Sequence, residues 1–311
     1  IARQEYNKKI IQTPYELPGE YFKGVNYILN QQPDKAIDLF LKLSKIDKDT
    51  AEVHLALGCL FRQRGEVDRA IRVHQSLINR SGLSTELHYQ AMRSLAMDYM
   101  SAGLLDRAES LCLELHDASP TDLSALKLLQ DIYQQEKEWF RAIDIARKIE
   151  VCEQGSLAAI IAQYYCELAE IGLQKDDVAQ AHRMLDKAIA EDPDCGRAMI
   201  IQGQIAYSEK RYEAAIGFFQ QLESKAPEYL GEVLLPLQSC YNALGKKESL
   251  VAYLEKVIRS GHSVELLLTA SRMLRNQKGT NEALSFLGSE LSHNPSLRGI
   301  QYMLELNLEE Q

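Results

Sequence analysis

The sequence predicts an all-α protein, a solenoid of about eight helix-turn-helix repeats over residues 21–296 that ends in a capping helix over 297–311. Three observations favour this fold. One skeleton recurs about every 34 residues, small and aromatic residues hold fixed places within it, and turn-forming residues separate its halves. All three follow from the packing of antiparallel helix pairs against one another.

The skeleton is marked by an apolar residue, in most repeats an alanine, that follows a turn. Successive marker residues are 34, 38, 34, 39, 34, 35 and 33 positions apart. They are Ala36, Ala70, Ala108, Ala142, Ala181, Ala215, Leu250 and Ala283. Self-similarity at this period is typical of a helical solenoid, in which each repeat contacts only its neighbours.

Small and aromatic residues recur in the first half of each repeat. Twelve positions before the marker, five of the eight repeats carry a small residue: Gly24, Gly58, Ala96, Ala169 and Gly203. Three positions further on there is often an aromatic residue: Tyr27, Phe61, Tyr99, Tyr133 and Tyr241. Small residues let two helix axes approach to about 8–10 Å, and we expect the aromatic ring to fill the space beside the crossing.

Turn-forming residues stand where the helices must end. Gly65, Gly103 and Gly245 follow the predicted first helices, where glycine tolerates a left-handed turn. Pro193, Pro227 and Pro295 close repeats, where proline can begin the next turn or helix. The two longer junctions fall around 79–86 and 150–156, and we expect the second to bend the superhelix.

Composition excludes several classes of function. The net charge is −9 and the basic residues are dispersed, so the chain lacks the basic patch of a nucleic-acid-binding protein. Six cysteines are scattered without a C-x-x-C, which argues against a disulfide framework and favours a reducing compartment. No apolar run approaches the ~18–20 residues that a membrane helix needs.

No catalytic or cofactor motif is present. Phosphate-binding glycine loops, H-E-x-x-H and G-x-S-x-G are all absent from the sequence. We expect Asp176 and Asp177 to cap a helix at a turn, and His54 and His74 to be structural. Because a solenoid also offers an open groove rather than a closed pocket, the sequence predicts a protein that is not an enzyme and holds no cofactor or metal.

A solenoid does offer a concave surface, lined by the first helix of each repeat, that can hold another polypeptide. The repeat register places nine residues on this surface: Arg62, Arg93, Met97, Lys127, Gln134, Arg197, Gln204, Tyr207 and Asn242. This mixture of cations, amides and a tyrosine suits an extended or helical peptide with some acidic character.

The skeleton resembles the tetratricopeptide repeat family, whose pattern is L-G-x-x-Y followed by A, F, A and a closing P. LGCLF at 57–61 with Ala70 matches the first part, and Ala215, Phe219 and Pro227 match the second. The resemblance implies a right-handed superhelix. The family's tryptophan position is unused, and its clamp for C-terminal carboxylates is not matched because Asp131 follows Lys127 by four positions.

Longer stretches resemble the lipopolysaccharide assembly protein B family of Gram-negative bacteria. They are YFKGVNYILNQQPDKAIDLFLKL (21–43), EVHLALGCLFRQRGEVDRAIRVHQSL (52–77), DYMSAGLLDRAESL (98–111) and YYCELAE (164–170). The resemblance implies an inner-membrane protein with an N-terminal transmembrane helix, cytoplasmic repeats and a C-terminal rubredoxin-type ribbon that binds zinc or iron. We expect 1–20 to be a linker after that anchor, and the ribbon to lie beyond the end of the sequence.

The same resemblance implies a non-catalytic adaptor that presents the deacetylase LpxC to the membrane AAA protease FtsH, opposed by an inner-membrane sensor protein. The alternative is a structural hub that assembles lipopolysaccharide synthesis and transport proteins. A periplasmic scaffold is a third interpretation, against which six unpaired cysteines argue. Exposed solenoid faces leave a homodimer open, but no heptad run or apolar stripe in the sequence specifies one.

Overall fold

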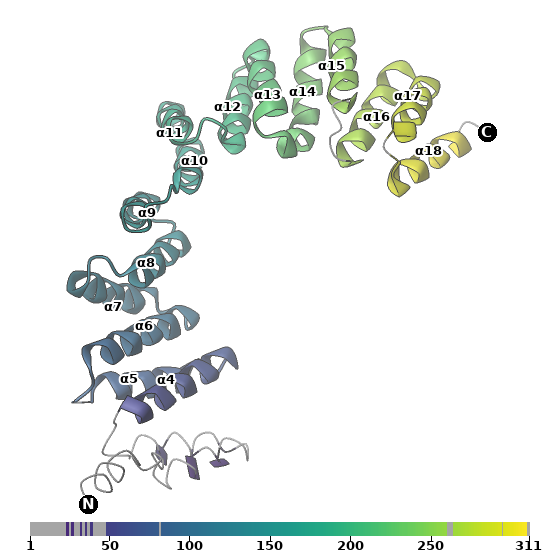
Figure 1. The fold of residues 1–311 in the computed structure, drawn as a ribbon. Helices are drawn as coiled ribbons and strands as arrows, with labels where there is room; N and C mark the ends of the chain where they lie inside the picture. Colours follow the sequence, from purple (N-terminus) through teal and green to yellow (C-terminus); the bar gives the residue numbers. More distant parts are fainter. Residues whose placement is uncertain are drawn as a thin grey trace, which may run out of the picture. The chain divides into compact units, whose positions relative to one another are not determined.

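The computed structural model describes residues 48–309 except 81, 260–263 and 294, together with scattered positions between Lys23 and Leu39. All regular structure in these residues is helical (Figure 1). The expected linker over 1–20 and most of the first expected repeat, including Ala36, lie outside the described residues.

The chain divides into two compact units, the first ending at Gly155. The described helices of the first unit are α4 (Lys48–Gln63), α5 (Val67–Ile78), α6 (Thr85–Ser101), α7 (Leu105–Ala118), α8 (Leu123–Gln135) and α9 (Trp139–Glu153). Each even-numbered helix packs against the odd-numbered helix that follows it, and α4, α6 and α8 also pack in succession. These are the first helices of three repeats.

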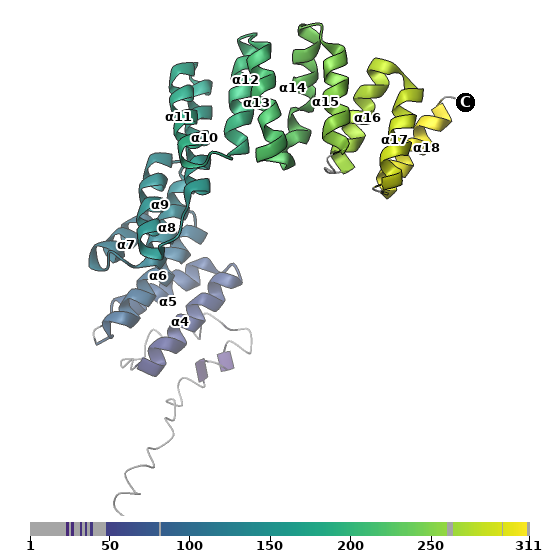
Figure 2. The same ribbon diagram turned by 45° about the horizontal axis from the view of Figure 1, so that its top comes forward.

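The second unit begins at Ser156 and continues the same pairing. Its helices are α10 (Ala158–Gln174), α11 (Val178–Glu191), α12 (Gly196–Ser208), α13 (Tyr212–Lys225), α14 (Leu230–Ala243), α15 (Lys247–Arg259), α16 (Val264–Lys278), α17 (Thr280–His293) and α18 (Leu297–Glu309). Figure 2 shows α12 and α13 side by side, as their contacts require. The described residues therefore contain seven helix pairs and a terminal helix, which confirms the all-α repeat fold.

The marker residues form the centre of the core. All that are described are fully buried: Ala70, Ala108, Ala142, Ala181, Ala215, Leu250 and Ala283. The small residues twelve positions earlier make room for a neighbouring ring. A Cβ atom at Gly58 would lie 2.3 Å from the His74 ring, and one at Gly203 would lie 2.3 Å from the Phe219 ring. Glycine is required there because a ring lies directly against the backbone of the first helix.

Six of the seven turns between the described paired helices share one backbone conformation, and the turn between α16 and α17 differs, with φ of 109° at Gly279. Gly65, Gly103 and Gly245 have φ of 77°, 72° and 70°, as the sequence predicted. Non-glycine residues take the same left-handed conformation at the same register position in three other repeats: Lys137, Asp176 and Lys210, with φ of 59°, 59° and 60°. Asp177 then caps α11 by accepting a hydrogen bond from the Gln180 amide at 2.8 Å, so the carboxylate pair serves the turn.

The two longer junctions differ. The loop 79–84 is longer than its counterparts, whereas the loop 154–157 is no longer than 119–122, and α10 has 17 residues against 13 in α8 and in α12. Between α5 and α6, the Ser84 hydroxyl accepts a hydrogen bond from the Leu87 amide and caps α6. α9 ends at Glu153 and is capped by Gln154, whose φ is 53°, close to the boundary between the two units. The bend expected at 150–156 stays a prediction. Every helix of the described residues is too short or too polar to span a bilayer.

Candidate functional site

The first helices of the first unit enclose a groove of about 490 Å³. Its lining comes from Leu55 on α4, from Gln90, Arg93, Ser94 and Met97 on α6, and from Ser124, Lys127, Leu128 and Asp131 on α8. Three residues placed on the concave surface by the repeat register are among them: Arg93, Met97 and Lys127. The register therefore located this side of the unit from the sequence alone.

The groove combines an apolar floor with a charged rim. Leu55 and Leu128 are half-buried, and Met97 is 41% exposed. Methionine is unbranched and adapts its shape to a partner side chain. Burial raises the pKa of the Asp131 carboxyl at the edge of the groove. The groove can thus accept an apolar side chain and contact polar groups around it.

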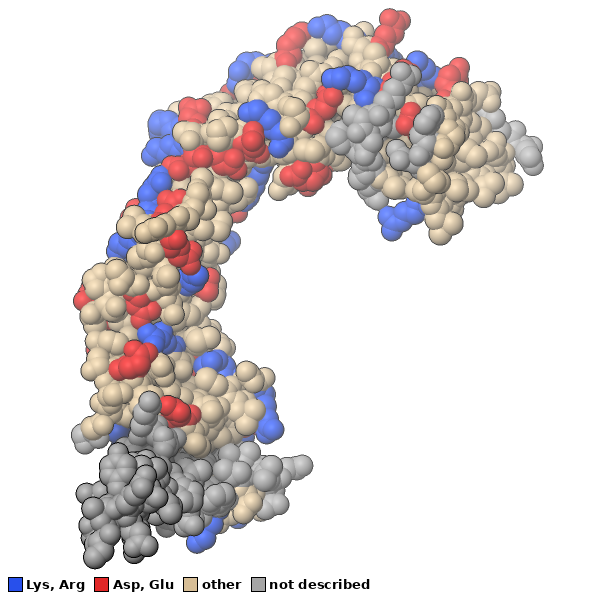
Figure 3. All heavy atoms as spheres, viewed as in Figure 1, with Lys and Arg blue, Asp and Glu red and all other residues tan. Residues whose placement is uncertain are grey.

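The cations of the rim are paired with carboxylates of the same unit. Arg93 donates hydrogen bonds to Asp122 at 2.6 Å and to Glu86 at 3.3 Å. Lys127 Nζ lies 2.6 Å from a carboxylate oxygen of Glu153. Basic and acidic side chains are likewise interspersed over the face seen in Figure 3. An acidic partner would have to exchange with these internal carboxylates.

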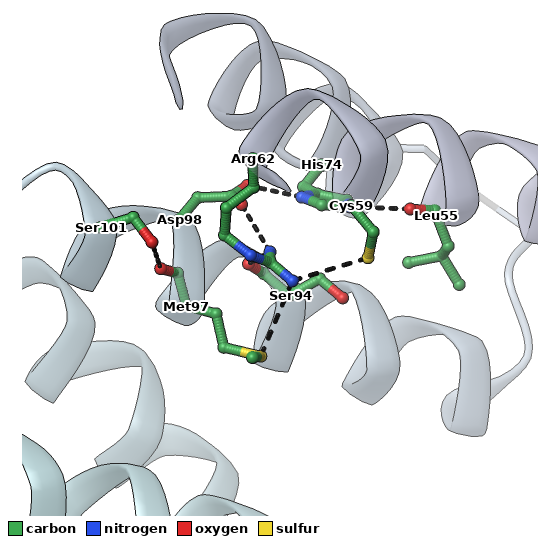
Figure 4. A network of polar contacts seen from close by, with 8 residues as sticks. All are labelled: Leu55, Cys59, Arg62, His74, Ser94, Met97, Asp98 and Ser101. Atoms are coloured by element: carbon green, nitrogen blue, oxygen red, sulfur yellow. Dashed lines mark hydrogen bonds and ion pairs between the residues drawn. The ribbon is translucent and has the colours of Figure 1, made fainter. Parts of the chain in front are cut away.

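Arg62 reaches from α4 toward the same groove (Figure 4). One guanidinium nitrogen donates to Asp98 Oδ1 at 2.6 Å and to the Ser94 carbonyl oxygen at 3.1 Å. The other lies 3.7 Å from Cys59 Sγ and 4.0 Å from Met97 Sδ. Arg62 thus joins a groove residue to a carboxylate in the core.

The carboxylate of Asp98 is fully buried and has a second partner. His74 Nδ1 on α5 donates to Asp98 Oδ2 at 2.5 Å, and His74 Nε2 lies 3.3 Å from the Leu55 carbonyl oxygen. Arg62, His74 and Asp98, which we call the buried triad, therefore connect α4, α5 and α6. His74 has a structural role, as expected, and His54 is also buried.

The remaining sequence-predicted residues do not line this groove. Gln134 is half-buried on α8. The other four belong to the second unit: Arg197, Gln204, Tyr207 and Asn242. Arg197 bonds to Glu167 and Glu170, each at 2.8 Å, and the exposed Tyr207 ring lies 5.9 Å from that of Tyr212. The nine predicted residues thus divide between two separately described units.

Sequence reasoning missed an apolar stripe on the terminal helix. Four apolar side chains on one face of α18 are exposed: Leu297 (84%), Ile300 (42%), Leu304 (56%) and Leu308 (71%). On another face, Leu306 is buried against the second unit. The spacing of three and four residues was visible in the sequence, but the acidic end of this segment suggested a polar cap.

The described parts of the chain hold no group of three or more His, Cys, Asp or Glu side chains that could bind a metal ion. Their polar clusters are ion pairs and helix caps. The arrangement is chemically suited to binding a polypeptide by shape, apolar contact and charge.

Comparison with protein-family models identifies tetratricopeptide repeats at residues 53–83 and 166–229. Solved structures with related folds include a tetratricopeptide repeat protein from Parabacteroides merdae (15% identity, TM-score 0.40, 83% of this chain and 98% of that one). Another is MamA (18% identity, TM-score 0.40, 59% of this chain and 95% of that one).

Two relatives are considerably more similar in sequence. Lipopolysaccharide assembly protein B of Escherichia coli K12 is 36% identical over 294 residues, which cover 94% of this chain and 76% of the relative. The protein of the same name from Haemophilus influenzae is 33% identical over 320 residues, covering 98% of this chain and 80% of that relative. On this similarity along nearly its whole length, the chain belongs to the lipopolysaccharide assembly protein B family.

Proposed function

We propose that this chain is the partner-binding region of a non-catalytic adaptor that regulates lipopolysaccharide synthesis. The observation that carries the proposal is the 36% identity over 94% of the chain to lipopolysaccharide assembly protein B of E. coli. More specifically, the adaptor presents the deacetylase LpxC to the membrane protease FtsH, and an inner-membrane sensor protein opposes the adaptor. The site of action is the cytoplasmic face of the inner membrane, and any zinc or iron is held by a ribbon outside this chain.

The fold supports an adaptor. A solenoid exposes much surface for its length and can bind two proteins at once without an active site. Attachment to the membrane that also holds the protease would raise the effective concentration of each partner for the other. Presentation then requires only that a substrate be held where the protease can engage it.

The groove of the first unit supplies a way to hold the substrate. One apolar side chain of the partner enters between Leu55, Met97 and Leu128. A partner carboxylate replaces Glu153 at Lys127 or Glu86 at Arg93. Both internal pairs are partly exposed, and such pairs are worth about 0–1 kcal/mol, so the exchange costs little. Apolar contact therefore provides affinity, and the paired cations provide orientation.

The test is the half-life of LpxC in cells depleted of the protein and then complemented. Wild-type protein should shorten the half-life again, whereas Arg93→Glu with Lys127→Glu should not, because both reversed charges repel an acidic partner. Arg147→Glu with Lys148→Glu is the matched control, since it makes the same charge change on α9, outside the groove lining. Circular dichroism should confirm equal helicity of the two variants.

The outcomes separate the parts of the proposal. If the groove variant restores turnover as well as the control does, the groove does not hold the substrate. If depletion leaves the half-life unchanged, the protein does not direct proteolysis. The name of the relatives, which describes assembly, would then favour the structural hub that gathers lipopolysaccharide synthesis and transport proteins.

A further inference from the structure

Two of the six cysteines meet inside the second unit. Cys166 lies on α10 and Cys195 directly precedes α12, 29 positions later in the chain. Their sulfur atoms are 3.8 Å apart, and the residues are 0% and 2% exposed. This distance allows a thiol–thiol hydrogen bond, and it places the two sulfurs close enough to react with each other after a small movement.

The surroundings of Cys195 favour a thiolate. The residue occupies the N-cap of α12, so its sulfur lies at the helix end where the backbone amides of Arg197 and Ala198 help to lower its pKa. Gln163 Nε2 donates to the same sulfur at 3.7 Å. The hydrogen bond from Cys166, followed by these backbone amides, lowers the pKa of Cys195, although burial opposes the shift.

Cys166 has the opposite character. Its hydrogen bond to Cys195 and then its burial raise the pKa of its thiol. Two other buried cysteines offer a comparison, since burial also raises the pKa of Cys112 and of Cys240. Cys195 is thus the buried thiol that its surroundings activate, and Cys166 is next to it.

We propose that Cys195 and Cys166 form a peroxide-sensitive pair, whose oxidation gives a disulfide that links α10 to α12. The Cys195 thiolate attacks one oxygen of hydrogen peroxide, the O–O bond breaks, and a sulfenic acid and hydroxide form. The Cys166 sulfur then attacks the Cys195 sulfur, its proton leaves with the sulfenic hydroxyl as water, and the S–S bond forms. Two thiols lose two hydrogens, and one peroxide is reduced to two waters.

The position of the pair gives the disulfide a structural consequence. The sulfurs must approach from 3.8 Å to about 2.05 Å. Arg197, two positions after Cys195, already bonds to Glu167 and Glu170 on α10. Oxidation would therefore make covalent a junction that an ion-pair cluster now holds, and would fix the spacing of two neighbouring first helices.

The experiment uses the full chain with Cys59→Ser and Cys152→Ser, which remove the two less buried thiols. The reduced protein is treated with hydrogen peroxide and digested with trypsin without reduction. Cleavage after Lys175 and Lys187 separates the two cysteines, so mass spectrometry identifies a linked peptide directly. We expect a Cys166–Cys195 peptide that has lost two hydrogens and that disappears when a thiol reductant is added.

Two variants test the order of events. In Cys166→Ser, dimedone should trap a sulfenic acid at Cys195. In Cys195→Ser, Cys166 should react no faster than Cys112. Circular dichroism checks folding, and Cys166→Ala replaces the serine variant if helicity falls. Oxidation of Cys195 no faster than that of Cys112, or peroxide consumption without the linked peptide, would overturn the proposal.

Discussion

Replacing Asp98 by alanine should destabilise the first unit strongly. The carboxylate is 0% exposed and accepts hydrogen bonds from Arg62 at 2.6 Å and from His74 at 2.5 Å. The Arg62 side chain is only 16% exposed, so water cannot fully replace the lost partner. The variant leaves a guanidinium and a buried imidazole without the group that both contact.

The magnitude follows from this burial. Removing one member of a buried charged pair costs about 3–5 kcal/mol, because the remaining charge is left uncompensated. A matched exposed pair provides the scale: in Lys127→Met, the lost contact joins side chains that are 57% and 36% exposed. Such pairs are worth about 0–1 kcal/mol. The two substitutions should therefore differ by a factor of three or more.

Urea denaturation followed by far-ultraviolet circular dichroism measures both variants against wild type. A cost below about 1 kcal/mol for Asp98→Ala, or a cost equal to that of Lys127→Met, would show that the buried triad does not hold α4, α5 and α6 together.

Three further predictions concern single positions. Ala70→Leu should lower the free energy of unfolding by roughly 1–3 kcal/mol, since Ala70 is fully buried; a melting temperature at or above that of wild type would contradict the packing. Lys210→Gly should stabilise the protein by about 1 kcal/mol, because φ of 60° strains any side chain; unfolding at lower urea would refute this. Burial raises the pKa of Cys112 to about 12, so at a pH well below that value iodoacetamide should modify Cys152 faster than Cys112; mass spectrometry measures both rates, and equal rates would contradict the prediction.

Much of the fold could be predicted because the packing of each repeat is local. The marker position is buried in every described repeat, and the regular spacing of the markers determines which helices pair with each other. The turns were only partly predictable. The turns at Gly65, Gly103 and Gly245 could be recognised because glycine favours a left-handed conformation. Lys137 and Lys210 take the same conformation at exposed positions, and nothing in the sequence indicates it there.

The position of the groove residues could be predicted from the sequence, but the pairing of the charged side chains could not. The register placed Arg93, Met97 and Lys127 on one surface, since side chains at equivalent positions face the same way. The shorter contacts of the two cations reach residues outside their own helices: Asp122 lies 29 positions from Arg93, and Glu153 lies on α9. Such pairing depends on tertiary packing, so the sequence suggested free cations where the structure has compensated ones.

The buried triad did have a signal in the sequence. The register position of Asp98 is apolar in the other described repeats: Leu60, Ile132, Ile171, Ile205, Cys240 and Met273. The position of His74 is apolar and buried in the others: Cys112, Ala146, Leu185, Phe219, Leu254 and Leu287. Two polar residues at core positions of neighbouring repeats predict that they meet, because neither could be buried alone.

This comparison also shows what the buried triad contributes. Every other described repeat fills the positions of His74 and Asp98 with apolar side chains, so the fold does not need a polar pair there, and a well-packed apolar replacement of a buried ion pair is often as stable. The triple variant Arg62→Met, His74→Phe and Asp98→Ile copies that solution at the two buried positions and copies Met100 at the third. Gly58 gives the new ring the room that Gly203 gives Phe219.

We expect the triple variant to recover most of the stability lost in Asp98→Ala. It should still fail to shorten the half-life of LpxC, because the variant lacks the Arg62 guanidinium that Asp98 holds beside Met97 at the groove. If the triple variant were as stable as wild type and restored LpxC turnover completely, the buried triad would serve only core packing and would not influence the groove. Low stability would mean that its polar contacts hold the repeats themselves together.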